Sequence, residues 1–176
     1  MNSINDLSGP KNLHGVFLNI FNKGILLTGK SGMGKSECAL ALLDRHHQLI
    51  CDDAPVFEVK NNQLIGHAPD EIANLLEVRG LGIINVQQLF GKQAIQKSSA
   101  LDLIIELNAP LAFDEPRRIN KELINKQIMG VSIPHLTVSV MLKHHMAILI
   151  ETAVKLVFPS DDTAKERILD LVETHS

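Results

Sequence analysis

Apolar runs bounded by turn residues predict a series of short β-strands along the chain. The Asn-Lys-Gly turn at residues 22–24 separates the first two runs and indicates a hairpin, and the pair Asn61-Asn62 indicates a second hairpin. The predicted strands cover residues 16–21, 25–28, 48–51, 56–60, 63–67, 101–107 and 136–140.

Other stretches carry apolar residues at the spacing of an α-helix or begin with residues that favour a helix start. Pro159 ends one of these helices, and Ser160 with the two aspartates that follow it caps the last. The predicted helices cover residues 36–47, 70–76, 120–129, 146–157 and 160–174.

Together these elements predict an α/β fold that has a mixed sheet and a helical C-terminal third. A chain of 176 residues is long enough to bury one sizeable core. We therefore expect a single domain over residues 1–176, with a core of about 13–158, a polar lead-in before it, and a final helix over about 160–174.

Residues 29–36 match the complete phosphate-loop motif G-x-x-x-x-G-K-[ST]. The motif stands between a predicted strand and a predicted helix, where backbone N–H groups and the helix N-terminus attract phosphate. In such a P-loop, Lys35 reaches the β- and γ-phosphates of a nucleotide, and the Ser36 hydroxyl can ligate Mg²⁺. The predicted nucleotide-binding residues are Gly29, Lys30, Ser31, Gly32, Met33, Gly34, Lys35 and Ser36.

Asp52 and Asp53 come directly after the strand that follows the P-loop helix. This is the carboxyl end of the strand, where open α/β sheets hold their ligands. One aspartate could lie near a metal and the other could accept a proton from a substrate hydroxyl. The alternative is a solvated loop, in which an Asp-Asp pair has no chemical role.

Glu77 and Arg79 stand beside Gly80 and Gly82, ahead of a further apolar strand. Glycines allow a ligand to approach the backbone closely, which favours a site. The alternative is a surface ion pair that contributes little. His14, taken alone, is typical of a structural histidine.

Charge and composition exclude several classes of function. The net charge of −3 and the pI near 6.2 argue against a nucleic-acid partner, because phosphate-backbone binding needs a clustered basic surface. The isolated Cys38 and Cys51 do not have metal or redox spacing, and the paired histidines do not have the i, i+4 spacing of a zinc site. Without a signal peptide or membrane span in the sequence, we expect a cytoplasmic protein.

From His14 to about Lys155 the chain resembles the catalytic domain of the HPr kinase/phosphorylase family, whose members phosphorylate a regulatory serine of the phosphocarrier HPr. Four stretches carry the resemblance, and the last of them looks like the family's own signature. They are His14-Gly15, residues 29–37, Asp52-Asp53 and residues 77–85.

The resemblance implies roles for the residues that bind nucleotide and metal. Lys35 would bind phosphate, and Ser36 and Glu77 would serve Mg²⁺. Asp52 would assist at the metal or orient its neighbour, and Arg79 belongs to the same site. ATP and Mg²⁺ are therefore the expected cofactors.

The resemblance also implies the catalytic residues. Asp53 looks like the general base toward the substrate serine, and the general acid in the reverse direction. His14 matches the family's catalytic histidine. Arg118 stands at about the place of an active-site arginine, with Arg117 as the alternative register. Family members form hexamers, so a homo-oligomer is expected.

The sequence departs from the family in two places. The N-terminal domain that many members carry is expected to be missing here. The Pro-Val-Arg-Pro-Gly-Arg-Asn loop, tied to phosphorolysis of phosphoserine, corresponds to residues 139–145, where Met141 and His144 replace both arginines. Neither side chain supplies the fixed bidentate contacts that arginine makes with an anion. We therefore expect kinase activity with weak or absent phosphorylase activity.

Three hypotheses remain open from the sequence. The first is an ATP- and Mg²⁺-dependent serine kinase of HPr or an HPr-like phosphocarrier. The second is a P-loop kinase of another protein or of a small-molecule hydroxyl. The third is a nucleotide-binding sensor without turnover.

Overall fold

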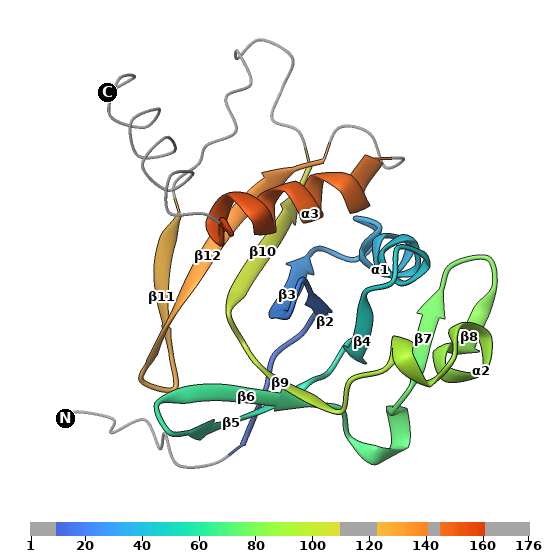
Figure 1. Cartoon of the computed structure of the whole chain (residues 1–176), viewed down its shortest axis with the longest axis horizontal. Coiled ribbons are helices and arrows are strands. Elements are labelled where there is room, and N and C mark those ends of the chain that lie inside the picture. The colour runs from blue at the N-terminus through green and yellow to red at the C-terminus, as the bar shows by residue number, and fades with distance from the viewer. Residues whose placement is uncertain (1–9, 110–122, 141–144, 161–176) are drawn as a thin grey trace, which may run out of the picture.

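The computed structural model describes residues 10–109, 123–140 and 145–160 (Figure 1). Its elements, in chain order, are β1 (Lys11–Asn12), β2 (Val16–Ile20), β3 (Lys23–Gly29), α1 (Lys35–Asp44), β4 (Gln48–Cys51), β5 (Val56–Lys60), β6 (Gln63–His67), η1 (Asp70–Ile72), β7 (Leu75–Val78), β8 (Gly82–Asn85), α2 (Val86–Phe90), η2 (Lys92–Ala94), β9 (Ser98–Ala100), β10 (Leu103–Asn108), β11 (Ile124–Ile128), β12 (Val131–Ser139) and α3 (Met146–Val157).

The central sheet is mixed, and its described strands have the order β11-β12-β10-β3-β2-β4. β3 and β12 both pair in parallel with β10. β2 pairs antiparallel with both β3 and β4, so β4 runs in the same direction as β3. The carboxyl ends of β3 and β4 therefore lie at the same edge of the sheet, which brings the loop after β3 near the loop after β4.

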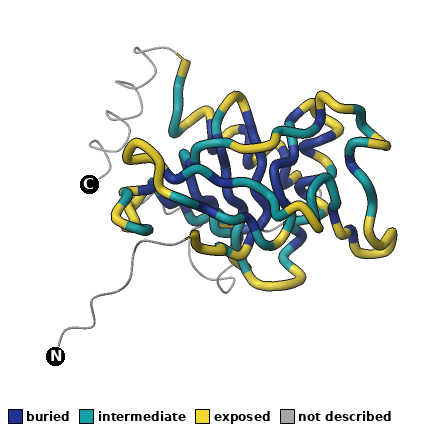
Figure 2. The backbone as a smooth tube through the Cα atoms, turned by 90° about the horizontal axis from the view of Figure 1, so that it is seen from below, coloured by how far each residue is buried: buried dark blue, intermediate teal, exposed yellow. Residues whose placement is uncertain are grey.

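The inner strands β2, β3 and β10 of the central sheet are covered on both faces and are apolar for that reason. Ile25 and Leu27 of β3 pack toward α1 and α3, whereas Leu26 between them packs toward the smaller sheet β1-β5-β6-β9. Figure 1 shows α3 on one side of the sheet and β5, β6 and β9 on the other. In Figure 2 the buried segments lie in the middle of the molecule and the exposed turns at its periphery.

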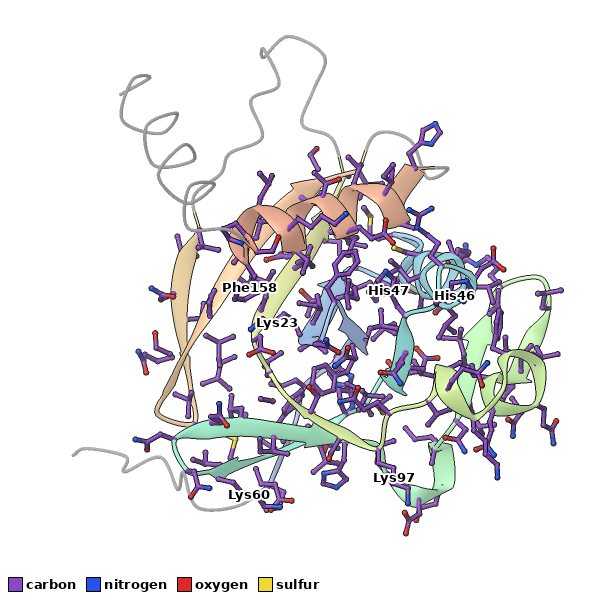
Figure 3. The ribbon with its side chains drawn as sticks, in the orientation of Figure 1. Lys23, His46, His47, Lys60, Lys97 and Phe158 are labelled. Carbon is purple, nitrogen blue, oxygen red and sulfur yellow. The ribbon has the colours of Figure 1, made fainter. Side chains whose placement is uncertain are left out.

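Side-chain pairs far apart in the sequence fasten α3 to the rest of the fold. Glu151 of α3 accepts hydrogen bonds from Arg45 Nε at 2.8 Å and Arg45 Nη2 at 2.5 Å, and its Oε1 lies 2.8 Å from His47 Nε2. Farther along, Lys23 Nζ lies 4.9 Å from the ring centroid of Phe158, and the two residues are labelled in Figure 3. α3 is thus tied to the end of α1 and to the start of β3.

Both predicted hairpins, the strand 48–51 and the helix after the P-loop motif are confirmed, as is the helix that ends before Pro159. The mixed α/β class is confirmed as well. The predicted strand 101–107 begins at Leu103, and the predicted strand 136–140 is the end of the longer β12. The final helix over about 160–174 lies outside the described residues, apart from Ser160.

Two predicted helices are wrong. Residues 70–76 form only the 3₁₀ turn η1, because Asn74 takes a left-handed φ of 65° and β7 then pairs with β8. In the predicted helix 120–129, the described residues 124–128 form the edge strand β11. The turn at Met129 and Gly130, with φ values of 50° and 79°, returns the chain into β12. The C-terminal third is therefore only partly helical.

No helix in the described ranges is both long enough and apolar enough to cross a membrane.

Candidate active site

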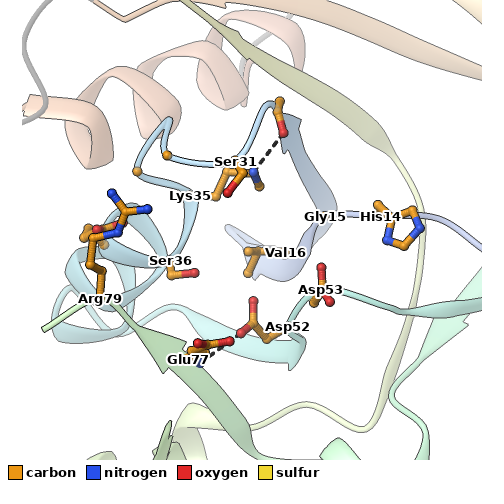
Figure 4. A pocket seen from close by; sticks show the side chains of 14 residues that line it. His14, Gly15, Val16, Ser31, Lys35, Ser36, Asp52, Asp53, Glu77 and Arg79 are labelled. Carbon is orange, nitrogen blue, oxygen red and sulfur yellow. Dashed lines mark hydrogen bonds between the residues drawn. The ribbon is translucent and has the colours of Figure 1, made fainter. Parts of the chain in front are cut away.

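A pocket of about 510 Å³ opens at the edge of the sheet where β3 and β4 end (Figure 4). It collects residues from four separate segments of the sequence. Its lining residues are His14, Gly15, Val16, Gly29, Ser31, Gly32, Gly34, Lys35, Ser36, Glu37, Asp52, Asp53, Glu77 and Arg79. The predicted site residues that lie in the described ranges are thus brought together, except that Lys30 and Met33 do not line the pocket.

The P-loop motif forms one wall of the pocket. Gly32 and Gly34 take left-handed φ values of 84° and 87°, and Gly34 is the N-cap of α1. Lys35 Nζ donates hydrogen bonds to the Gly29 carbonyl at 2.8 Å and to the Lys30 carbonyl at 3.1 Å. The ammonium group is therefore held across the loop, where an anion bound at the helix N-terminus would meet it.

The two aspartates after β4 both line the pocket. Asp53 has a left-handed φ of 68°. Asp52 Oδ2 accepts a hydrogen bond from the Glu77 backbone N–H at 2.9 Å, which links the loop after β4 to β7. The pKa of Asp52 is raised, first by burial and then by the nearby charges of Asp53 and Glu77, although the Glu77 N–H partly offsets the rise.

Asp52→Asn is expected to raise the free energy of unfolding at pH 7 by roughly 0.5–1 kcal/mol. A raised pKa means that the folded chain binds the Asp52 proton more tightly than the unfolded chain does, so the ionised carboxylate lowers stability. Asparagine keeps an oxygen for the Glu77 N–H and removes the charge. Urea unfolding measures the difference, which should shrink as the pH falls toward 3.8, the ordinary pKa of an aspartate.

The matched control for this substitution is Asp44→Asn, because Asp44 is an exposed carboxylate at the end of α1. We expect its stability to stay within about 0.5 kcal/mol of the wild type. A loss of stability at pH 7 in Asp52→Asn would contradict the electrostatic account of this pocket.

Backbone hydrogen bonds place His14 beside the second aspartate. The Leu13 N–H donates to the Pro55 carbonyl at 3.3 Å, and the Gly15 N–H donates to the Asp53 carbonyl at 3.0 Å. A Cβ on Gly15 would stand 2.4 Å from the Leu27 carbonyl oxygen, so only glycine allows this close approach. In Figure 4, His14 and Asp53 lie on the side of the pocket opposite Arg79.

Glu77 and Arg79 come from the hairpin of β7 and β8. The predicted glycine loop is therefore a hairpin whose turn follows Val78, with the Leu81 N–H donating to the Val78 carbonyl at 3.0 Å. Buried Leu76 and Val78 belong to the same core cluster as α1, which leaves the alternate residues Glu77 and Arg79 exposed toward the pocket.

Three lining residues, Gly15, Val16 and Glu37, were not among the predicted site residues. Glu37 stands in the first turn of α1, is exposed and lines the pocket. The signal was its position directly after Ser36 in the motif. Arg118 and Arg117, together with Met141 and His144, lie outside the described residues.

The buried cysteines do not supply a nucleophile to the site. Burial raises the pKa of Cys38 and of Cys51 to about 12, so both remain protonated thiols at neutral pH. Among the described residues, no group of three His, Cys, Asp or Glu side chains is placed to hold a metal ion by itself.

Comparison with known proteins gives one consistent result. The family model described as HPr Serine kinase C-terminal domain matches residues 5–167. The chain is 40% identical over 148 residues to the HPr kinase/phosphorylase of Stenotrophomonas maltophilia (strain K279a), covering 82% of this chain and 47% of that protein. It is 41% identical over 148 residues to the HPr kinase/phosphorylase of Xylella fastidiosa (strain M12), with the same two shares covered.

A solved structure supports the same assignment. The Hpr(Ser) kinase/phosphatase from Coxiella burnetii aligns with a TM-score of 0.74 and 37% sequence identity, covering 82% of this chain and 94% of that one. The chain spans about half the length of the curated relatives it matches. On the family match and these identities, the chain belongs to the HPr Serine kinase C-terminal domain family.

Proposed function

We propose that this chain is an ATP- and Mg²⁺-dependent serine kinase that phosphorylates HPr or an HPr-like phosphocarrier protein. The observation that carries the proposal is the pocket, which holds the P-loop motif, Asp53 and Glu77 together. Phosphoryl transfer needs a phosphate cradle, a metal, a base and cations for developing charge. The family membership supports HPr as the acceptor.

The loop after β3 would bind the nucleotide phosphates. Its backbone N–H groups and the N-terminus of α1 attract phosphate, and Lys35 adds a full positive charge at the same place. Lys35 would exchange its bonds to two loop carbonyls for contacts with the β- and γ-phosphates. The remaining loop residues would act mainly through their backbone.

The donor set at the pocket fits Mg²⁺. Ser36, Glu77 and Asp52 supply only oxygen donors. Burial and the nearby charges of Asp53 and Glu77 raise the pKa of Asp52, and this cluster of carboxylates favours a cation there. Magnesium is usually bound by one or two carboxylates, waters and substrate phosphates, so a ready-made protein cage is not required. When bound, Mg²⁺ would neutralise charge on the β- and γ-phosphates.

Asp53 would serve as the general base. It would take the proton of the acceptor serine hydroxyl while the hydroxyl oxygen bonds to the γ-phosphorus, and the bond to the bridging oxygen breaks to release ADP. His14 lies next to Asp53 because the Gly15 N–H is bonded to the Asp53 carbonyl, and Arg79 lies across the pocket. Both side chains would help to stabilise the negative charge that develops during transfer. Arg118 is proposed as an active-site arginine on the family resemblance alone.

The three hypotheses can be separated in one assay with radiolabelled ATP, Mg²⁺ and different acceptors. The acceptors are HPr from the same organism, HPr with its regulatory serine changed to alanine, and a panel of hydroxylated metabolites. Label on HPr alone supports the proposal, and label on a metabolite supports the second hypothesis. Nucleotide binding without transfer to any acceptor supports the sensor hypothesis and contradicts the proposal.

The reverse reaction is expected to be weak. Because Met141 and His144 replace two arginines, binding of inorganic phosphate loses two fixed cations. We expect phosphorolysis of phosphoserine-HPr to run at least about tenfold slower than the kinase reaction, given that a charge-assisted hydrogen bond contributes about 1.5–3 kcal/mol. The rate of phosphorolysis is measured as pyrophosphate released from phosphoserine-HPr and inorganic phosphate. A rate equal to that of the kinase reaction would contradict the prediction of weak phosphorylase activity.

A homo-oligomer, with a hexamer as the expected form, remains a proposal that rests on the family resemblance. Cytoplasmic location remains a proposal that rests on the sequence.

A further inference from the structure

Gly34 lies between the pocket and the first turn of α3. One side of this residue lines the pocket, next to Lys35 and Ser36. A Cβ on Gly34 would stand 2.8 Å from Cε of Met146, so the methionine methyl group packs against the Cα of Gly34. The loop therefore has no room for a side chain at this position.

Met146 is itself held firmly in place. It is the first residue of α3, is only 3% exposed, and belongs to the core cluster that includes Cys38 and Ala39 of α1. Five residues later, Glu151 binds Arg45 and His47 at the other end of α1. α3 thus supports α1 at both ends, and Met146 is the contact that touches the P-loop motif.

We propose that Met146 is a positioning residue: its contact with Gly34 fixes the position of the P-loop backbone and thereby determines the affinity for nucleotide phosphates. The inference rests on the proposed function only in requiring that the pocket binds nucleotide. Phosphate is bound by backbone N–H groups at the N-terminus of α1, and the geometry of a hydrogen bond decides its strength. If the Met146 side chain is shortened, the loop can move into the space that it leaves. The backbone N–H groups would then no longer be aligned for hydrogen bonds to phosphate.

His145 is the N-cap of α3 and directly precedes Met146, so a shift at the first turn of α3 would move the methyl group that lies against Gly34. Nucleotide affinity should therefore respond to substitutions at position 146, which contacts Gly34 and does not line the pocket.

The first test compares three variants of the full chain by isothermal titration with ATP and Mg²⁺. Met146→Ala is expected to raise the Kd for ATP about tenfold, which is within the range of coupling through packed side chains. Met146→Leu fills most of the space and should restore the Kd to within about threefold of the wild type. Ile150→Ala, a buried residue one turn farther along α3, should lower thermal stability but leave the Kd within about threefold.

A phosphate-only probe separates positioning from general loosening of the fold. Inorganic tripolyphosphate contacts only the phosphate site. Met146→Ala should therefore raise the Kd for tripolyphosphate by the same factor as the Kd for ATP. Equal Kd values for wild type and Met146→Ala, or an equal loss in Ile150→Ala, would overturn the inference and leave the proposed kinase function intact. Tight ATP binding by the wild type without transfer to HPr would overturn the function alone.

A double substitution serves as the check that does not need a nucleotide. Gly34→Ala introduces a Cβ that meets Met146, so the Met146→Ala background should reduce its effect on the thermal midpoint. An alanine at position 34 is strained by the left-handed φ of 87° both in the wild type and in Met146→Ala, so this strain cancels when the two shifts are compared. Strictly additive shifts would show that the two residues do not act on each other and would overturn the proposal.

Discussion

Asp53→Asn is expected to lower kcat for phosphoryl transfer to HPr by about 10²- to 10⁴-fold, the usual contribution of a general base. The side chain keeps its size but can no longer accept the serine proton. Nucleotide affinity should stay within about threefold of the wild type, because the P-loop motif and not Asp53 binds the phosphates. Steady-state kinetics with HPr and titration with ATP measure the two quantities separately.

Asparagine suits this position because it tolerates the left-handed backbone that Asp53 adopts at φ 68°. A loss of activity can therefore be assigned to chemistry once circular dichroism shows an unchanged fold. The matched control is Asp44→Asn, which removes an exposed carboxylate of the same size and should leave kcat unchanged. A kcat for Asp53→Asn close to the wild-type value would exclude Asp53 as the base.

Glu151→Gln is expected to lower the free energy of unfolding at pH 7 by about 2–4 kcal/mol, because it leaves Arg45 and His47 without their shared carboxylate. Because Arg45 is half-exposed, the loss of stability should be smaller than for a fully buried ion pair that loses one partner. Guanidinium unfolding measures the change, and Glu71→Gln, at an exposed glutamate of η1, is the matched control.

The same pair of variants gives a pH test. Hydrogen bonds from Arg45, the largest cause, and from His47 lower the pKa of Glu151 to about 2 from an ordinary 4.5. Its contribution to stability is therefore fully present above pH 4.5 and is lost as the pH falls toward 2. The stability gap between wild type and Glu151→Gln should narrow over that interval, and a gap independent of pH would contradict the account.

The two hairpins and the strand 48–51 could be predicted because their signals are local. Residues 22–24 and the Asn61-Asn62 pair mark turns, and Asn61 and Asn62 do adopt left-handed φ values of 51° and 60°. The gathering of the P-loop motif and Asp53 could be anticipated because each follows the carboxyl end of a strand, whereas His14, which precedes β2, was placed with them only by the family resemblance.

The errors lie where pairing over a distance decides the structure. The apolar residues Leu75, Leu76 and Val78 fit either a helix or a strand, and only pairing with β8 selects the strand. β11 likewise owes its extended form to β12, across a turn whose Gly130 was the one local signal. The contact of Met146 with Gly34 joins residues far apart in the sequence, so no local pattern could show it.

The measurement that tests the central claim most directly is mass spectrometry of HPr after incubation with this protein, ATP and Mg²⁺. The account predicts that one phosphoryl group is added to HPr on the regulatory serine, that the product is stable to acid, and that Asp53→Asn slows its formation by about 10²- to 10⁴-fold. Unmodified HPr in the presence of wild-type protein that binds ATP, or modification that persists at full rate in Asp53→Asn, would contradict it.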